Sequence, residues 1–165
     1  MNYSENNYDY IKSLEYKAEN FFKVSKYKEA KFIYIKLIDL ATNNYFYLAR
    51  LGYIELIEKN LESAKSLFLK SISICSTYVE GYNCLGYIFK EQGDLDNAKY
   101  YFNKALKIDK NYIPALSNLA ILLMNKEPMQ AEKLLLKAKS FNNDSPDINF
   151  NLGSVYTILK DYQNA

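Results

Sequence analysis

The sequence predicts an all-α protein in which antiparallel helix pairs follow one another along the chain as a solenoid. Two observations predict this fold: an internal repeat, and amphipathic stretches that alternate with short polar turns. The tetrad Leu-Gly-Tyr-Ile occurs at 51–54 and again 34 residues later at 85–88, and a third Leu-Gly pair stands at 152–153. A fixed period of this length indicates a repeat architecture in which neighbouring units complete each other's core.

Each repeat is expected to contain two helices of about 13 or 14 residues, or about 20 Å at 1.5 Å per residue. A polar lead-in over residues 1–10 precedes them. The expected repeats are 11–44, 45–78, 79–112 and 113–145, with a partial fifth at 146–165.

The turns inside the repeats contain residues that end one helix and start the next. Gly93 can take the left-handed conformation that ends a helix, and Asp94 can cap the following one. Asn60 is expected to cap in the same way in the second repeat. Pro128 is expected in the first turn of the second helix of the fourth repeat, where its missing N–H costs little.

Residues of one kind recur at the same phase of each repeat. The small residues of one column are Ala30, Ala64, Ala98, Ala131 and Ala165. A bulky column contains Tyr34, Phe68, Phe102 and Leu135, and a second, mostly small column contains Leu37, Ser71, Ala105 and Ala138. Glycine or alanine at a helix crossing permits close approach, and the large residues beside it fill the space.

This pattern resembles the tetratricopeptide repeat, a helical hairpin, over nearly the whole chain from Ile11. The resemblance implies a right-handed superhelix whose first helices line a concave groove, where extended peptides or short helices of partner proteins bind. The family's proline at the thirty-second phase is absent, and Lys17 replaces the usual leucine, so the first repeat is expected to be a partly polar cap.

The groove phases supply the residues that we expect to contact a ligand. Tyrosine offers contact area with few torsions, asparagine can bind a peptide backbone, and the single arginine can pair with a carboxylate. The predicted groove residues are Tyr16, Arg50, Tyr53, Asn83, Tyr87, Asn118, Ile121 and Asn151.

Each of these residues has an alternative role that the sequence leaves open. Tyr53 and Tyr87 belong to the repeated tetrad and equally fit packing between repeats. The asparagines fit a compositional surplus, because the chain contains 18 of them. Arg50 also fits a simple pair with a nearby glutamate.

The clamp with which some family members hold carboxylate tails of chaperones is missing in every register. In the first register Glu15 and Glu19 occupy its positions and would repel such a ligand. One lysine per repeat falls on the opposite face. We expect these lysines to form a solvated surface, and we favour this role over a nucleic-acid site. Those lysines are Lys36, Lys70, Lys104 and Lys137.

Composition bounds the remaining functions. The net charge of +2 is evenly split between the halves of the chain, so nucleic acid is not an expected partner. The chain contains no histidine and no phosphate-binding or nucleophile motif, so we expect no enzyme, cofactor or metal site. The two cysteines lack a paired spacing, which favours a cytoplasmic protein. No long apolar run is present, so we expect no membrane span.

The C-terminal end is the last feature of the sequence that bears on function. The pattern places Ala165 at the start of a second helix of the fifth repeat, so the first helix of that repeat lacks its partner. Solenoids generally need polar caps. The chain is therefore expected to be a fragment of a longer array, with a homo-oligomer through this open end as the alternative.

Overall fold

The computed structural model describes the backbone of residues 3–164 and the side chains of residues 7–160, and within these ranges it is all-α, with nine helices and no strand. The helices are α1 (Tyr3–Lys23), α2 (Tyr27–Leu40), α3 (Tyr45–Ile57), α4 (Leu61–Ile74), α5 (Val79–Glu91), α6 (Leu95–Ile108), α7 (Ile113–Leu123), α8 (Pro128–Phe141) and α9 (Pro146–Asn164). The chain divides into two compact units, residues 1–81 (unit 1) and 82–165 (unit 2), and α5 crosses the division.

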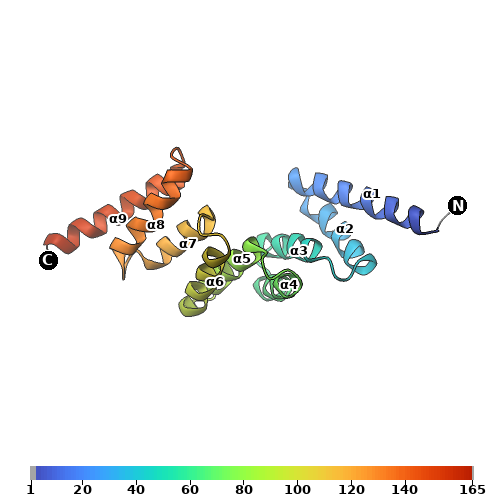
Figure 1. The fold of residues 1–165 in the computed structure, drawn as a ribbon, viewed down its shortest axis with the longest axis horizontal. Helices are drawn as coiled ribbons and strands as arrows, with labels where there is room; N and C mark the ends of the chain where they lie inside the picture. Colours follow the sequence, from blue (N-terminus) through green and yellow to red (C-terminus); the bar gives the residue numbers. More distant parts are fainter. Residues whose placement is uncertain (1–2, 165) are drawn as a thin grey trace. The chain divides into compact units, whose positions relative to one another are not determined.

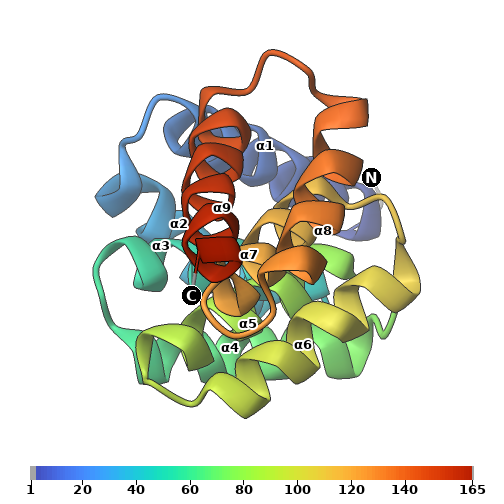
Figure 2. The ribbon, with the colours of Figure 1, turned by 90° about the vertical axis from the view of Figure 1, so that its left-hand side faces the viewer.

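Helices that follow one another in the chain pack against one another within each unit (Figure 1). In unit 1, α1 packs on α2, α2 on α3, and α3 on α4. In unit 2, α6 packs on α7, α7 on α8, and α8 on α9, and the last two lie side by side in Figure 2 as well. This consecutive packing of helix pairs is the predicted tetratricopeptide-like architecture.

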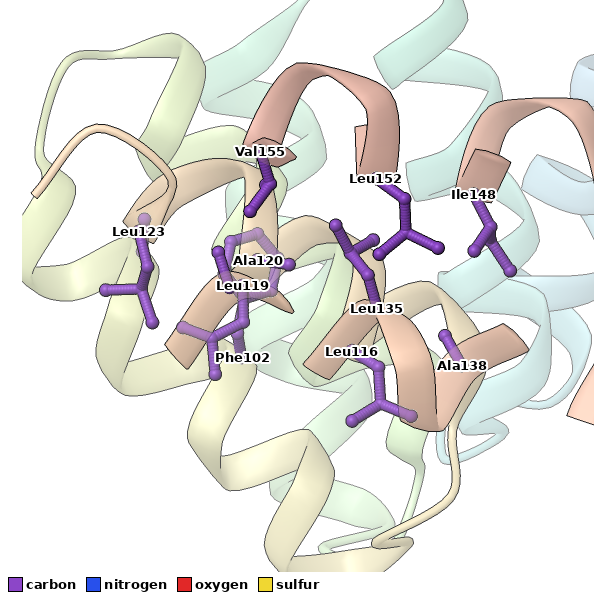
Figure 3. Packing of buried hydrophobic residues seen from close by; sticks show 12 residues of the cluster. Phe102, Leu116, Leu119, Ala120, Leu123, Leu135, Ala138, Ile148, Leu152 and Val155 are labelled. Carbon is purple, nitrogen blue, oxygen red and sulfur yellow. The ribbon is translucent and has the colours of Figure 1, made fainter. Parts of the chain in front are cut away.

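The small and bulky columns lie in the core, as the repeat pattern predicts. The described members of the alanine column have no exposed surface, and the bulky column is at most 1% exposed. Ala165 lies outside the described residues. In unit 2 the bulky side chains meet the apolar faces of α7 and α9 (Figure 3). The residues that form this cluster in the figure include Phe102, Leu116, Leu119, Leu135, Leu152 and Val155.

Three turns between paired helices use the same left-handed backbone conformation. It occurs at Ser25, Lys59 and Gly93, with φ of +58°, +62° and +80°, and these positions are 34 residues apart. In each turn the next N–H donates to the carbonyl five residues back, at 2.8 to 2.9 Å. This hydrogen bond is the one that ends a helix in a Schellman motif. The repeat therefore fixes backbone conformation even where the residue is not glycine.

The predicted caps are partly right. The Asp94 carboxylate accepts from the Asn97 N–H at 3.1 Å, and Pro128 is the first residue of α8, as expected. The prediction for Asn60 is wrong, because its side chain does not cap α4. The Asn60 amide instead donates to Glu55 at 2.8 Å.

The two terminal helices differ from the expected pattern. α1 begins at Tyr3, so it extends into the stretch expected to be a lead-in. α9 is continuous to Asn164, so no turn separates the first helix of the fifth repeat from the start expected for a second one. Residues 158–164 contain no glycine or proline, which are the strongest signals for ending a helix.

Candidate ligand-binding surface

A pocket of about 420 Å³ opens in unit 1 on the side of α1 that carries the predicted groove residue Tyr16. Residues three and four apart share one face of a helix, which is why four α1 side chains reach the same space. Helices α2 and α3 close the pocket with aromatic rings. The residues that line it, called the unit 1 pocket below, are Lys12, Glu15, Tyr16, Glu19, Tyr34, Phe46 and Tyr47.

Two glutamate–tyrosine pairs form the inner wall of the unit 1 pocket. The Tyr47 hydroxyl donates to Glu15, and the Tyr34 hydroxyl donates to Glu19. The Lys12 ammonium also donates to Glu15, at 2.6 Å. Burial opposes ionisation of Glu15, but the hydrogen bonds from Lys12 and Tyr47 outweigh it and lower the pKa of Glu15. The pocket therefore holds an ionised carboxylate at neutral pH.

The same pairs keep both tyrosines protonated. Burial first, and then the hydrogen bond to Glu15, raise the pKa of Tyr47. Burial and the hydrogen bond to Glu19 raise the pKa of Tyr34 in the same way. Each hydroxyl proton is thus fixed on its tyrosine and directed at a carboxylate.

Arg50 lies beside the pocket with its guanidinium already bound. It donates to Glu19 through Nε at 3.0 Å and through Nη2 at 3.2 Å. Its guanidinium carbon lies 4.6 Å from the centre of the Phe22 ring and 4.7 Å from that of Phe46, both within the range of cation–π contact. The pair with a nearby glutamate, which the sequence left open, is the arrangement found. Ligand contact by Arg50 stays a prediction.

The two predicted groove tyrosines of unit 1 differ in their surroundings. Tyr16 lines the pocket and is 71% exposed. Tyr53 is also exposed, and its ring centre lies 5.6 Å from that of Phe22. Tyr16 therefore presents its ring to solvent and to the pocket, whereas Tyr53 also packs within unit 1.

Five of the predicted residues belong to unit 2. Asn118 on α7 donates from Nδ2 to Oδ1 of Asn83 on α5 at 3.0 Å, so two of the predicted asparagines contact each other. The ammonium of the neighbouring Lys90 lies 4.9 Å from the centre of the Tyr87 ring. The side chains of Asn83, Tyr87 and Asn118 are half-buried, as are those of the remaining two predicted residues, Ile121 and Asn151.

Sequence reasoning missed Tyr34 and Tyr47 as pocket residues. Tyr34 belongs to the buried column, and Tyr47 falls on a phase that does not face the groove in the repeat pattern. Both are almost fully buried, yet their hydroxyls reach the two α1 glutamates. The available signal was chemical: buried tyrosines need hydrogen-bond partners, and Glu15 and Glu19 occupy groove phases.

A second pocket, of about 860 Å³, opens in unit 2 beside the turn between α7 and α8. Its walls combine charged side chains with Met129, which is well exposed, and with Leu159 of α9. None of the predicted groove residues lines it. The lining residues are Lys126, Glu127, Pro128, Met129, Gln130, Lys133 and Leu159.

The part of the chain that the structure describes contains no group of three or more cysteine, aspartate or glutamate side chains placed to hold a metal ion. None of its helices combines the length and the apolar character needed to cross a membrane. Cys75 and Cys84 do not form a disulfide.

The comparisons with known proteins agree with the geometry. Residues 79–112 match the family model for the tetratricopeptide repeat, and no curated protein sequence matches the chain. A structure of PilF from Pseudomonas aeruginosa covers 95% of this chain and 72% of its own, with 17% identity and a TM-score of 0.82.

The descriptions of two similar solved structures mention peptide binding. The first TPR of Spaghetti, bound to an HSP90 peptide, is 22% identical over 68% of this chain and 89% of its own, with a TM-score of 0.64. YrrB, a TPR protein with an unusual peptide-binding site, is 17% identical over 87% of this chain and 74% of its own, with a TM-score of 0.67. At these identities the likeness establishes a shared fold.

Proposed function

Since this chain is a tetratricopeptide repeat protein, we propose that it is a non-catalytic scaffold that binds a peptide or short helix of a partner protein. The observation that carries this proposal is the open, aromatic pocket of unit 1, lined by α1 residues at groove phases. Ligand pockets are concave and mostly apolar, with a few placed polar groups, and the unit 1 pocket has this composition. One protein of the same fold is described as bound to a peptide and another as having a peptide-binding site, which supports the same class of ligand here.

The predicted groove residues are proposed as a contact surface in each unit separately. In unit 1 the exposed ring of Tyr16 is the main anchor, because a tyrosine gives a large contact area at small entropic cost. In unit 2 the linked amides of Asn83 and Asn118 retain further donors and acceptors for a peptide backbone. Arg50 is proposed to act indirectly, by holding Glu19 and Phe46 in place.

A peptide selection on the immobilised chain tests the proposal. Random twelve-residue peptides displayed on phage are selected, synthesised and titrated by fluorescence anisotropy. We expect micromolar binders that Tyr16→Ala weakens by about tenfold, or about 1.4 kcal/mol. The matched control is Phe32→Ala, because Phe32 is a 73% exposed aromatic residue on α2 outside the pocket. Equal affinity for the wild type and Tyr16→Ala, or no selected binder, would contradict the proposal.

Self-association through α9 is the second candidate function, and one observation favours it. Phe150 and Tyr156 on α9 are exposed, and beyond the adjoining residues of α9 itself no atom lies within 4 Å of where a Cβ on Gly153 would be. A helix surface of this kind can accept another helix closely. Light scattering during size-exclusion chromatography separates the two candidate functions. A fraction of dimer that rises with protein concentration, and that Phe150→Arg abolishes, favours assembly over peptide binding.

A further inference from the structure

We propose that the unit 1 pocket accepts a basic side chain, lysine or arginine, of the bound partner segment. This inference rests on the proposed function and specifies the chemistry of its ligand. The aliphatic part of the basic side chain would lie against the Tyr16 and Phe46 rings, with its cationic head at Glu15. Three properties of the pocket carry the inference: its hydrogen-bond balance, its aromatic walls and the exchangeable position of Lys12.

The hydrogen-bonding groups of the pocket are dominated by acceptors. The hydroxyl protons of Tyr34 and Tyr47 are both donated to glutamates within unit 1. Both oxygens of Glu15 accept one bond and keep a second lone pair, whereas Oε1 of Glu19 already accepts from Tyr34 and Arg50 and only Oε2 keeps a lone pair. Lys12 is the lining residue that contributes positive charge. A ligand that donates several hydrogen bonds fits this surface, whereas a carboxylate does not.

The pocket walls suit a cation in a second way. Four of the seven lining residues are aromatic, from three different helices. The faces of such rings attract ammonium and guanidinium groups, and the attraction grows when the cation leaves water. Unit 1 already contains one example of this geometry, because the Arg50 guanidinium contacts the rings of Phe22 and Phe46 and binds Glu19. The proposed ligand side chain would repeat that arrangement on the open side of Phe46.

Lys12 is the cation that a ligand would replace. Its side chain is 52% exposed and pairs with Glu15 three residues later on the same helix. Exposed pairs of this spacing contribute little to stability, so exchanging Lys12 for a ligand cation costs little. Arg50 does not exchange in this way, because two hydrogen bonds and two rings hold it.

Small capped amino acids test the inference without a known partner. The ¹⁵N-labelled full chain is titrated with N-acetyl-lysine methylamide, N-acetyl-arginine methylamide and N-acetyl-glutamate methylamide while amide NMR spectra are recorded. We expect the two cationic probes to shift resonances around Glu15 and Phe46, with dissociation constants of about 1–10 mM. The acidic probe should bind about fivefold more weakly or not at all.

Three variants make the titration specific. Glu15→Gln keeps an oxygen that can accept from Tyr47, and it should weaken the cationic probes by about threefold or more. Glu62→Gln is the matched control, because Glu62 pairs with Lys65 at the same spacing but lies outside the pocket and is 75% exposed. Lys12→Ala changes an exposed residue, and it should tighten the cationic probes by removing their competitor.

The outcomes of this titration and of the peptide selection are distinguishable. Equal binding of the acidic and cationic probes, or a Lys12→Ala variant that binds cations no more tightly than the wild type, would overturn the basic-side-chain inference. Selected peptides that bind without lysine or arginine would also overturn it while leaving peptide binding intact. Cation binding in the NMR titration without any selected peptide would instead contradict the scaffold function.

Discussion

At the scale of single residues, Glu55 shows how charge is stabilised inside unit 1. Its phase is one where three of the other four repeats carry an aromatic residue, and only 8% of its surface is exposed. The Lys31 ammonium lies 2.8 Å from it, and the Asn60 amide donates to it at 2.8 Å. Burial opposes ionisation of Glu55, but the bonds from Lys31 and Asn60 prevail and lower its pKa.

The lowered pKa of Glu55 predicts a pH dependence of stability. A carboxyl group whose pKa is lower in the folded state stabilises the fold above its unfolded pKa of about 4.3 and loses this contribution as pH falls through the folded value. Glu55→Gln should therefore destabilise unit 1 by about 1–2 kcal/mol at pH 7 and by less as pH falls below about 4. Urea unfolding from pH 3 to 7 measures this, with Glu62→Gln as the exposed control. A difference that does not shrink in acid would argue against an ionised Glu55.

The sequence predicted the positions of the pocket residues on α1 better than their partners. The periodicity of a helix is enough to place Lys12, Glu15, Tyr16 and Glu19 on one face. Which carboxylate binds Arg50 depends on distances between helices that are remote in the sequence. Those distances are set by packing, so a phase argument does not give them.

At the scale of helices, the glycine and alanine columns determine how closely neighbours approach. A Cβ on Gly86 would lie 2.5 Å from Cδ1 of the fully buried Phe102 ring, and one on Gly52 would lie 3.2 Å from the Phe68 ring. Gly153 occupies the same phase but faces no atom within 4 Å. The periodicity of the sequence predicts one role for these three glycines. Only the packing in the structure shows that the space beside each glycine differs.

Alanine substitutions along this column should give a graded series. Gly86→Ala should destabilise the protein by about 1–3 kcal/mol through overpacking against Phe102. Gly52→Ala should have a smaller effect, because the neighbouring ring needs to shift by only a few tenths of an ångström. Gly153→Ala should stabilise α9 by about 0.5–1 kcal/mol, because alanine favours the helix and meets nothing. Urea unfolding of the three variants measures the order, and a destabilising Gly153→Ala would contradict the open surface on α9.

At the scale of the whole molecule, the lysines that recur once per repeat are largely engaged within the chain. The Lys36 ammonium lies 5.1 Å from the centre of the Tyr10 ring in unit 1. In unit 2, Lys104 lies 5.3 Å from the centre of the Tyr100 ring, and Lys137 donates to the Lys110 carbonyl. With a net charge of +2, the chain has little excess charge for a phosphate backbone.

Filter binding to single-stranded RNA across a range of salt concentrations should therefore show weak retention with a shallow salt dependence. Neutralising four phosphates would give a slope of log K against log salt of about −3. We expect a slope no steeper than about −1. The paired change Lys104→Glu and Lys137→Glu should leave it unaltered, and a steep slope that this variant removes would identify the lysines as a nucleic-acid site.

The arrangement of Arg50 makes it a natural reporter of unit 1. It is the single arginine among 165 residues, so a reagent selective for guanidinium groups has one target in this protein. The rings of Phe22 and Phe46 and the carboxylate of Glu19 contact that target, and 29% of its side chain stays exposed. Because Glu19 and Phe22 belong to α1 and Arg50 to α3, losing these contacts should speed the chemical labelling of Arg50, so the labelling rate reports on the packing of α1 against α3.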